Sequence, residues 1–229
     1  MEITSSTNSV IDSFDTYLNT QTQETTTKNI KNKIVDFLDA HDGFSSLSPT
    51  DEKIFRNILS DNKLTKEEAD TLSYEQVERI RDLIFPSPIT EEVFNATLIV
   101  QWGVDIFATQ ATTNRQFNEA YYNTLKELND EDARKLRSEV DNNLGQLYLG
   151  KKLEATFSYG DSYLANPWEY HNMNADFGKF IKDVISHHQS KIDNPIVNPV
   201  AKEQYQSIID VYKVLEKNYE KIVNKPKYA

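Results

Sequence analysis

Three side chains have the chemistry for proton transfer in a catalytic site: Asp105, Glu169 and His171. Asp105 belongs to a polar stripe on an otherwise apolar helix that we expect over residues 90–109. The stripe consists of Thr97, Gln101, Asp105 and Thr109. In an internal cavity, desolvation would raise the pKa of Asp105 toward the range that suits acid–base catalysis. With Glu169 or His171 nearby, the stripe predicts a metal-independent hydrolase or lyase. The alternative is that it forms the solvated edge of a buried helix.

A second group of side chains is typical of a binding surface. The segment 159–177 combines aromatic rings with asparagine side chains in a stretch without a clear helical period. Such rings offer a large contact area together with a polar group. The residues expected to bind a partner are Tyr159, Tyr163, Trp168, Tyr170 and His171. The alternative is that these side chains cover the core beneath a long loop.

The sequence predicts no metal ion and no cofactor. It has no cysteine, and its histidines lack the i, i+4 spacing of a zinc-binding helix. The histidines are His41, His171, His187 and His188. Residues 57–68 resemble an EF-hand loop only in part, because Leu59 stands where a calcium ligand is required. The six glycines are scattered singly, so no glycine-rich phosphate loop is present.

The net charge of the chain argues against some classes of binding partner. The net charge is −11, and the acidic excess lies in the first 150 residues. A nucleic-acid-binding surface needs dense positive charge, so we expect no nucleic-acid partner. No apolar run is long enough for a membrane span, which predicts no integral membrane segment. The last expected helix carries a row of lysines: Lys213, Lys217, Lys221 and Lys225. We expect this row to face solvent. The alternatives are that it contacts an acidic partner or the acidic N-terminal part of this chain.

The first 27 residues are rich in Ser and Thr and contain no Lys or Arg. This composition predicts a disordered tail without a cleavable secretory signal. It resembles the uncleaved N-terminal signals of proteins exported through bacterial flagellar or type III machinery. We therefore expect a cytoplasmic protein, with export by such a route as the alternative.

Helical periodicity dominates the rest of the chain. Residues 28–86 predict a small acidic subdomain of short helices, with starts marked by Ser48-Pro49 and by the capping box from Ser73 to Gln76. Pro86 and Pro88 mark a boundary, after which residues 89–229 predict the main bundle.

Within the main bundle, the clearest expected helix runs from Asn129 to Gly150 and buries Leu144. His188 falls on the apolar face of a later helix and is expected in the core with its polar atoms satisfied. Residues 156–164 are ambiguous between helix and a minor β-hairpin.

The expected fold is all-α: an irregular bundle of seven to nine helices with a small N-terminal helical subdomain and a flexible tail. Because no sequence motif of a known reaction occurs, we expect a non-enzymatic protein that binds another protein. A bacterial accessory protein or an exported protein would fit this description. The alternatives are the hydrolase or lyase described above and a chaperone that shields a helical client.

Overall fold

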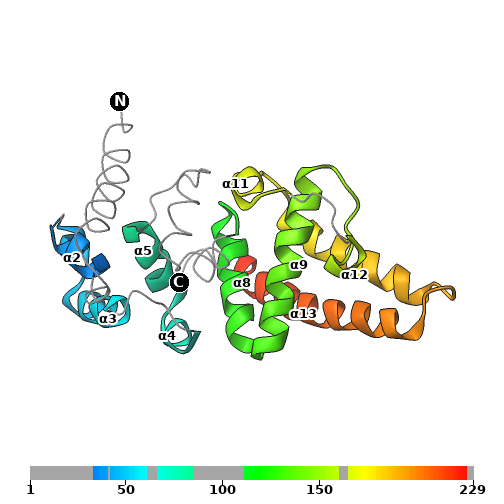
Figure 1. Cartoon of the computed structure of the whole chain (residues 1–229), viewed down its shortest axis with the longest axis horizontal. Coiled ribbons are helices and arrows are strands. Elements are labelled where there is room, and N and C mark those ends of the chain that lie inside the picture. The colour runs from blue at the N-terminus through cyan, green and yellow to red at the C-terminus, as the bar shows by residue number, and fades with distance from the viewer. Residues whose placement is uncertain (1–32, 41, 61–65, 85–110, 160–164, 226–229) are drawn as a thin grey trace, which may run out of the picture. The chain divides into compact units, whose positions relative to one another are not determined.

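A computed structural model of the chain describes residues 33–40, 42–60, 66–84, 111–159 and 165–225 (Figure 1). These residues form helices joined by short connections, and none of them lies in a β-strand. The all-α prediction is therefore confirmed. The chain divides into two compact units, residues 1–107 and residues 108–229.

The first unit contains short helices with strong local start signals. Its elements are α2 (Lys33–Ala40), a 3-10 turn (Gly43–Ser46), α3 (Pro49–Leu59), α4 (Lys66–Thr71) and α5 (Tyr74–Ile84). As predicted, Ser48 caps α3 by accepting a hydrogen bond from the backbone N–H of Asp51. The capping box of α5 is also present, because Ser73 and Gln76 each accept a backbone N–H from the other.

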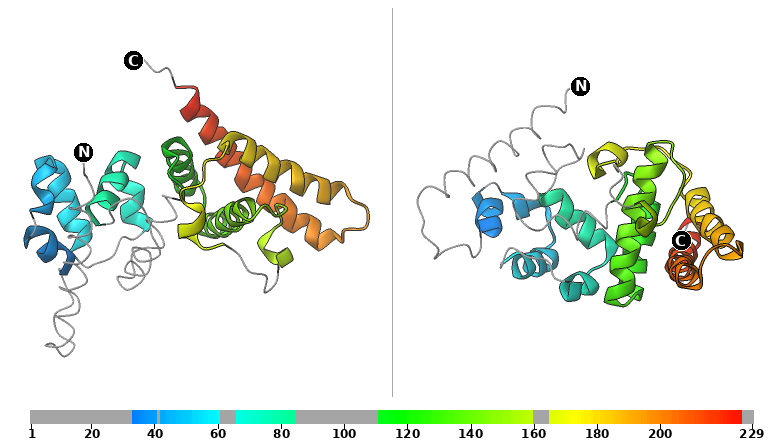
Figure 2. Two further views of the ribbon diagram at one scale, coloured as in Figure 1. Left: turned by 90° about the horizontal axis from the view of Figure 1, so that it is seen from above. Right: turned by 45° about the vertical axis from the view of Figure 1, so that its right-hand side comes forward.

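The second unit is built on two helical pairs. Its elements are α8 (Arg115–Glu127), α9 (Asp130–Tyr148), α10 (Thr156–Tyr159), α11 (Pro167–Tyr170), α12 (Phe177–Asp193) and α13 (Pro199–Val223). Helices α12 and α13 run side by side in opposite directions and are joined by a short turn, as both views in Figure 2 show. One pair consists of α12 and α13, and the other of α8 and α9. Helix α8 also packs against α13, and this contact joins the two pairs.

Helix α9 begins and ends where the sequence predicts. The side chain of Asn129 accepts the N–H of Asp132, and three acidic residues occupy the first turn, where the helix dipole favours negative charge. Gly150 ends the helix with φ of 65°, a left-handed conformation that glycine adopts without steric cost. The N–H of Gly150 donates a hydrogen bond to the carbonyl of Leu147 at 3.1 Å.

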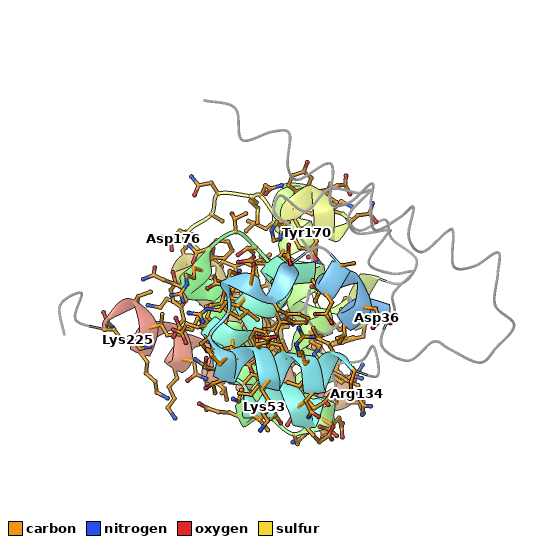
Figure 3. All side chains as sticks on the ribbon, turned by 90° about the vertical axis from the view of Figure 1, so that its left-hand side faces the viewer. Asp36, Lys53, Arg134, Tyr170, Asp176 and Lys225 are labelled. Atoms are coloured by element: carbon orange, nitrogen blue, oxygen red, sulfur yellow. The ribbon has the colours of Figure 1, made fainter. Side chains whose placement is uncertain are left out.

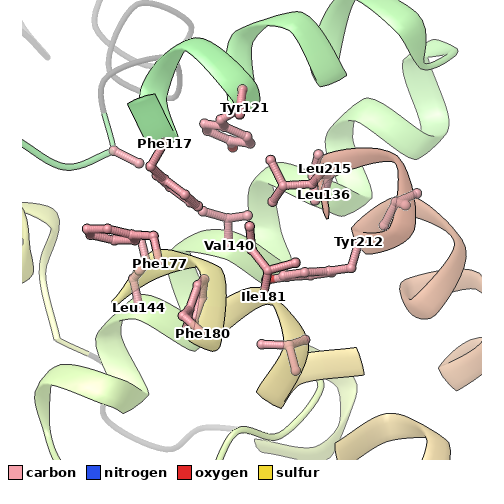
Figure 4. Packing of buried hydrophobic residues seen from close by; sticks show 14 of the residues in the cluster. Phe117, Tyr121, Leu136, Val140, Leu144, Phe177, Phe180, Ile181, Tyr212 and Leu215 are labelled. Atoms are coloured by element: carbon pink, nitrogen blue, oxygen red, sulfur yellow. The ribbon is translucent and has the colours of Figure 1, made fainter. Parts of the chain in front are cut away.

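The core of the second unit lies between α8, α9, α12 and α13 (Figure 4). Phe117 stacks on Phe177 with ring centroids 4.7 Å apart, and Phe180 meets Tyr212 edge-on at 6.4 Å. Leu144 is fully buried in this cluster, as predicted. Every described helix longer than two turns in this unit therefore contributes side chains to one continuous core.

The structure decides between two alternatives for residues 156–159, and several sequence expectations lie outside the described residues. Residues 156–159 form helix α10, so the first half of the suggested hairpin is not a strand. The segment before it is tied to α9 by side-chain hydrogen bonds, which a local reading of turn residues does not capture. The second half of that hairpin, the tail over residues 1–27, the proline boundary and the helix expected over 90–109 lie outside the described residues.

Candidate functional site

The structure describes only part of the two predicted sites. Asp105 and Tyr163 lie outside the described residues. For Tyr159 and Trp168 it describes only the backbone, which belongs to α10 and α11 respectively. The proposed meeting of the Asp105 stripe with Glu169 and His171 therefore stays a prediction.

Tyr170 and His171 lie inside the second unit. Tyr170 is 1% exposed and belongs to the core cluster, and its hydroxyl donates to Oδ1 of Asp141 at 3.2 Å (Tyr170 is labelled in Figure 3). His171 is 2% exposed, and its carbonyl accepts the N–H of Thr113 at 3.0 Å. These two residues cover the core, which is the arrangement given above as the alternative to a binding surface.

Glu169 has a structural contact at the start of α11. Its Oε2 accepts the backbone N–H of Asn166 at 2.6 Å and the side-chain amide of the same residue at 3.1 Å. This is the return hydrogen bond of a capping box, made by the third residue of the helix. The carboxylate is therefore already engaged at the N-terminus of its own helix.

Asp141 is a titratable residue that the sequence analysis did not single out. Desolvation raises its pKa to about 6, although the hydroxyl of Tyr170 and the positive charge of Arg137 both favour the ionised carboxylate. Because the Asp141 side chain lies at the surface, solvent limits how far desolvation can act. We therefore assign it no acid–base role.

A row of buried polar side chains runs along α9. It consists of Glu139, Asn142, Asn143 and Gln146, each at most 2% exposed. Asn142 and Gln146 donate to the carbonyl of Glu154 at 2.7 and 3.1 Å, and the N–H of Glu154 donates to Gln146 at 2.6 Å. These hydrogen bonds fix residues 151–155 across the helix. The amides of α9 thus position the side chain of Glu154.

The carboxylate of Glu154 lies beside two side chains of α12. Lys191 Nζ lies 3.0 Å from Oε1, and His187 Nε2 lies 3.4 Å from Oε2. Desolvation raises the pKa of Glu154, but hydrogen bonds from Lys191 and His187 outweigh it, so the pKa lies below its ordinary value. Paired with Lys191 and next to His187, the carboxylate is held as an ion and is not a free base.

His188, one residue along α12, is buried without hydrogen bonds. It is 0% exposed, and neither ring nitrogen has a hydrogen-bond partner among the described residues. The prediction that His188 lies in the core is confirmed, whereas the expectation that its polar atoms are satisfied is wrong. The reason is that its neighbours are rings: those of His187 and Tyr205 both lie 5.5 Å away.

The turn between α12 and α13 exposes apolar side chains. We define the hairpin end as residues 194–200. In it Ile196 is 90% exposed and Val200 is 66% exposed, and Pro195 and Pro199 are also exposed. Its backbone is fixed, because Asn194 accepts the N–H of Ile196 at 3.0 Å and Asn198 caps α13. The sequence analysis did not single out this segment, in which Ile196 follows Pro195 and Val200 follows Pro199.

The lysine row on α13 is partly paired within the same unit. Lys225 reaches Glu119 of α8 at 3.0 Å (Lys225 is labelled in Figure 3), and Lys221 lies 3.9 Å from Glu127. Lys213 and Lys217 are exposed, as expected. Exposed pairs of this kind contribute little to stability, about 0–1 kcal/mol each.

Neither a metal-binding cluster nor a membrane-spanning helix is found among the described residues. There, no three His, Asp or Glu side chains gather closely enough to hold a metal ion. None of the helices found in that part of the chain combines the length and the apolar character needed to cross a bilayer. Finally, comparison with protein-family models, with curated proteins and with solved structures finds no match to this chain.

Proposed function

We propose that this chain is a non-enzymatic helical protein that binds a partner protein through the hairpin end, residues 194–200. The observation that carries this proposal is the exposure of Ile196 and Val200 on a fixed turn. Apolar side chains left in water on a rigid support are typical of interaction sites, because a partner can cover them without ordering the backbone first. The helices behind the turn are packed along their length, so the turn is a preformed feature.

The surroundings of the hairpin end favour a particular kind of partner. Asp193 and Glu203 are exposed beside it, and Lys202 is half-buried. The nearby Lys191 is already paired with Glu154. The excess of negative charge at the rim favours a partner surface that is apolar in the middle and carries basic side chains around it.

The titratable groups of the second unit support an interaction protein rather than an enzyme. Glu154, Glu169 and Glu139 all have hydrogen bonds or ion pairs within the unit. Each of these contacts holds a helix or a connection in place. A general base, by contrast, must be able to reach a substrate proton.

The test is affinity capture with the full chain, followed by purification of the captured protein and measurement of its affinity. The variant Ile196→Ser/Val200→Ser should weaken binding by about tenfold or more, since two apolar contacts are lost. Tyr148→Ser is the matched control, because Tyr148 is an exposed apolar side chain on a different helix, α9. Equal affinity of the double variant and the wild type for every purified partner would reject the hairpin end as the binding site.

A further inference from the structure

Helix α10 lies over the aromatic ring that shields His188. The ring of Phe157 is 5.1 Å from the ring of Tyr205, and the hydroxyls of Ser158 and Tyr205 are 3.5 Å apart. Tyr205 in turn lies against His188, with ring centroids 5.5 Å apart. We call Phe157 and Ser158 the α10 cover. They contact Tyr205, which is 7% exposed and packs against the fully buried His188.

The position of His188 is compatible only with an uncharged ring. A neutral imidazole has one N–H donor and a protonated one has two, and no acceptor is within hydrogen-bond distance of either nitrogen. Leaving a buried charged donor without a partner costs more than leaving a neutral one. A proton can therefore remain on His188 only when water reaches the ring.

Charged and titratable groups surround His188 on three elements. His187 and Lys191 lie on its own helix, Glu154 lies on the segment before α10, and Tyr205 lies on α13. Desolvation lowers the pKa of His188 to about 4, the charge of His187 lowers it further, and that of Glu154 partly opposes the change. The hydrogen bonds of Lys191 and His187 keep Glu154 ionised as the pH falls, so Glu154 stays attached to α12.

We propose that the α10 cover opens in acid: His188 takes up a proton from solvent, Tyr205 moves aside, and Phe157 and Ser158 leave α13. The contacts of the residues just before Phe157 remain. Glu154 stays paired with His187 and Lys191, and Thr156 stays hydrogen-bonded to Glu139. The opened form exposes the rings of Tyr205 and His188, which are buried in the covered form.

The size of the effect follows from linkage. An exposed histidine has a pKa of 6.5, against about 4 for the covered ring. The covered form binds fewer protons, so its advantage over the open form is complete above pH 6.5 and falls as the pH drops toward 4. Between pH 7.5 and pH 5.0 the open population should rise about 30-fold.

The experiment is amide hydrogen exchange of the full chain at pH 7.5 and pH 5.0, corrected for the intrinsic exchange rate. We expect the opening constant of amides in 157–159 to rise about 30-fold in the wild type. In His188→Leu it should change by less than about threefold, because leucine does not titrate. Ser186→Ala, at an exposed position of the same helix, is the control, and it should keep the wild-type rise.

A second measurement does not depend on a variant that folds. In a ¹H–¹⁵N titration of the wild type, the His188 ring and the amides of Phe157 and Ser158 should titrate with one shared midpoint. The proposal is overturned if exchange in 157–159 is the same at both pH values, if His188→Leu keeps the rise, or if the two midpoints differ. It is also overturned if exchange rises equally in α8 and α9, which would indicate global unfolding.

Discussion

Thr156 donates both its backbone N–H and its hydroxyl to the same oxygen of Glu139, at 3.1 and 2.5 Å. The two residues are 17 positions apart, so this pair ties the start of α10 to the middle of α9. Glu139 is almost fully buried, and the two donors stand in for the water that the carboxylate has lost. The buried carboxylate thus adds to the contacts by which Asn142 and Gln146 hold the segment before α10 on α9.

The first prediction concerns the donor in this pair. Thr156→Val keeps the shape of the side chain but leaves Glu139 with one donor fewer. Since the lost hydrogen bond goes to a charged group, the free energy of unfolding should fall by about 1.5–3 kcal/mol, measured by urea denaturation. Thr113→Val, at an exposed threonine, is the matched control. Equal stabilities of the two variants would show that the Thr156 hydroxyl does not support Glu139.

The second prediction concerns the pH dependence caused by Glu139. Desolvation raises its pKa above the ordinary value of 4.5, despite the hydrogen bonds from Thr156 and Asn143 that oppose it. The folded protein therefore binds the proton more tightly than the unfolded chain, and stability falls as the pH rises from 4.5 through the folded pKa.

Glu139→Gln removes this titration. The stability of the variant relative to the wild type should increase as the pH rises through that window, in parallel denaturation series. Glu131→Gln, at an exposed position of the same helix, should show no such trend. A stability difference between Glu139→Gln and the wild type that stays constant from pH 4 to pH 8 would contradict the buried position of the charge.

The third prediction compares two buried tyrosines. The hydroxyl of Tyr121 has no hydrogen-bond partner in the part of the chain that the structure describes, whereas that of Tyr170 donates to Asp141. Tyr121→Phe should therefore leave the free energy of unfolding unchanged or raise it by up to about 1 kcal/mol, while Tyr170→Phe should lower it by about 1–3 kcal/mol. Calorimetry of both variants tests this, and the reverse order would mean that a water molecule or another group binds the Tyr121 hydroxyl.

The fourth prediction concerns the core of the second unit. Leu144 is fully buried between α9 and its neighbours, so Leu144→Ala should cost about 2–5 kcal/mol. Arg134→Ala is the control because Arg134 is exposed on the same helix (it is labelled in Figure 3). A loss for Leu144→Ala no greater than for Arg134→Ala would reject the core assignment.

Local features of the fold could be predicted from the sequence, because their causes are local. Ser48, Ser73 and Asn129 cap helices within three residues of their own positions. Leu144 and His188 are buried because an apolar face repeats at the helical period. Helix α10 was harder to predict from the sequence, because residues of α9 fix it. Glu139 accepts the N–H of its first residue, and Asn142 donates to the segment before it.

The candidate sites could not be predicted because they too depend on contacts between residues that are far apart in the sequence. Lys191 and His187 meet Glu154 from positions more than thirty residues later, and nothing near Glu154 in the sequence indicates them. The aromatic residues after 159 suggested a surface, yet Tyr170 and His171 are buried. Composition reveals how many apolar rings a loop contains, but packing decides which of them face the core.

The central claim is that the hairpin end is where this protein meets its partner. Site-specific photo-cross-linking of the full chain in its native cells tests it most directly, with the cross-linker at position 196 in one sample and at position 148 in another. We predict a protein adduct from position 196 that is absent from position 148. Adducts that form only from position 148, or equally from both positions, would contradict the claim.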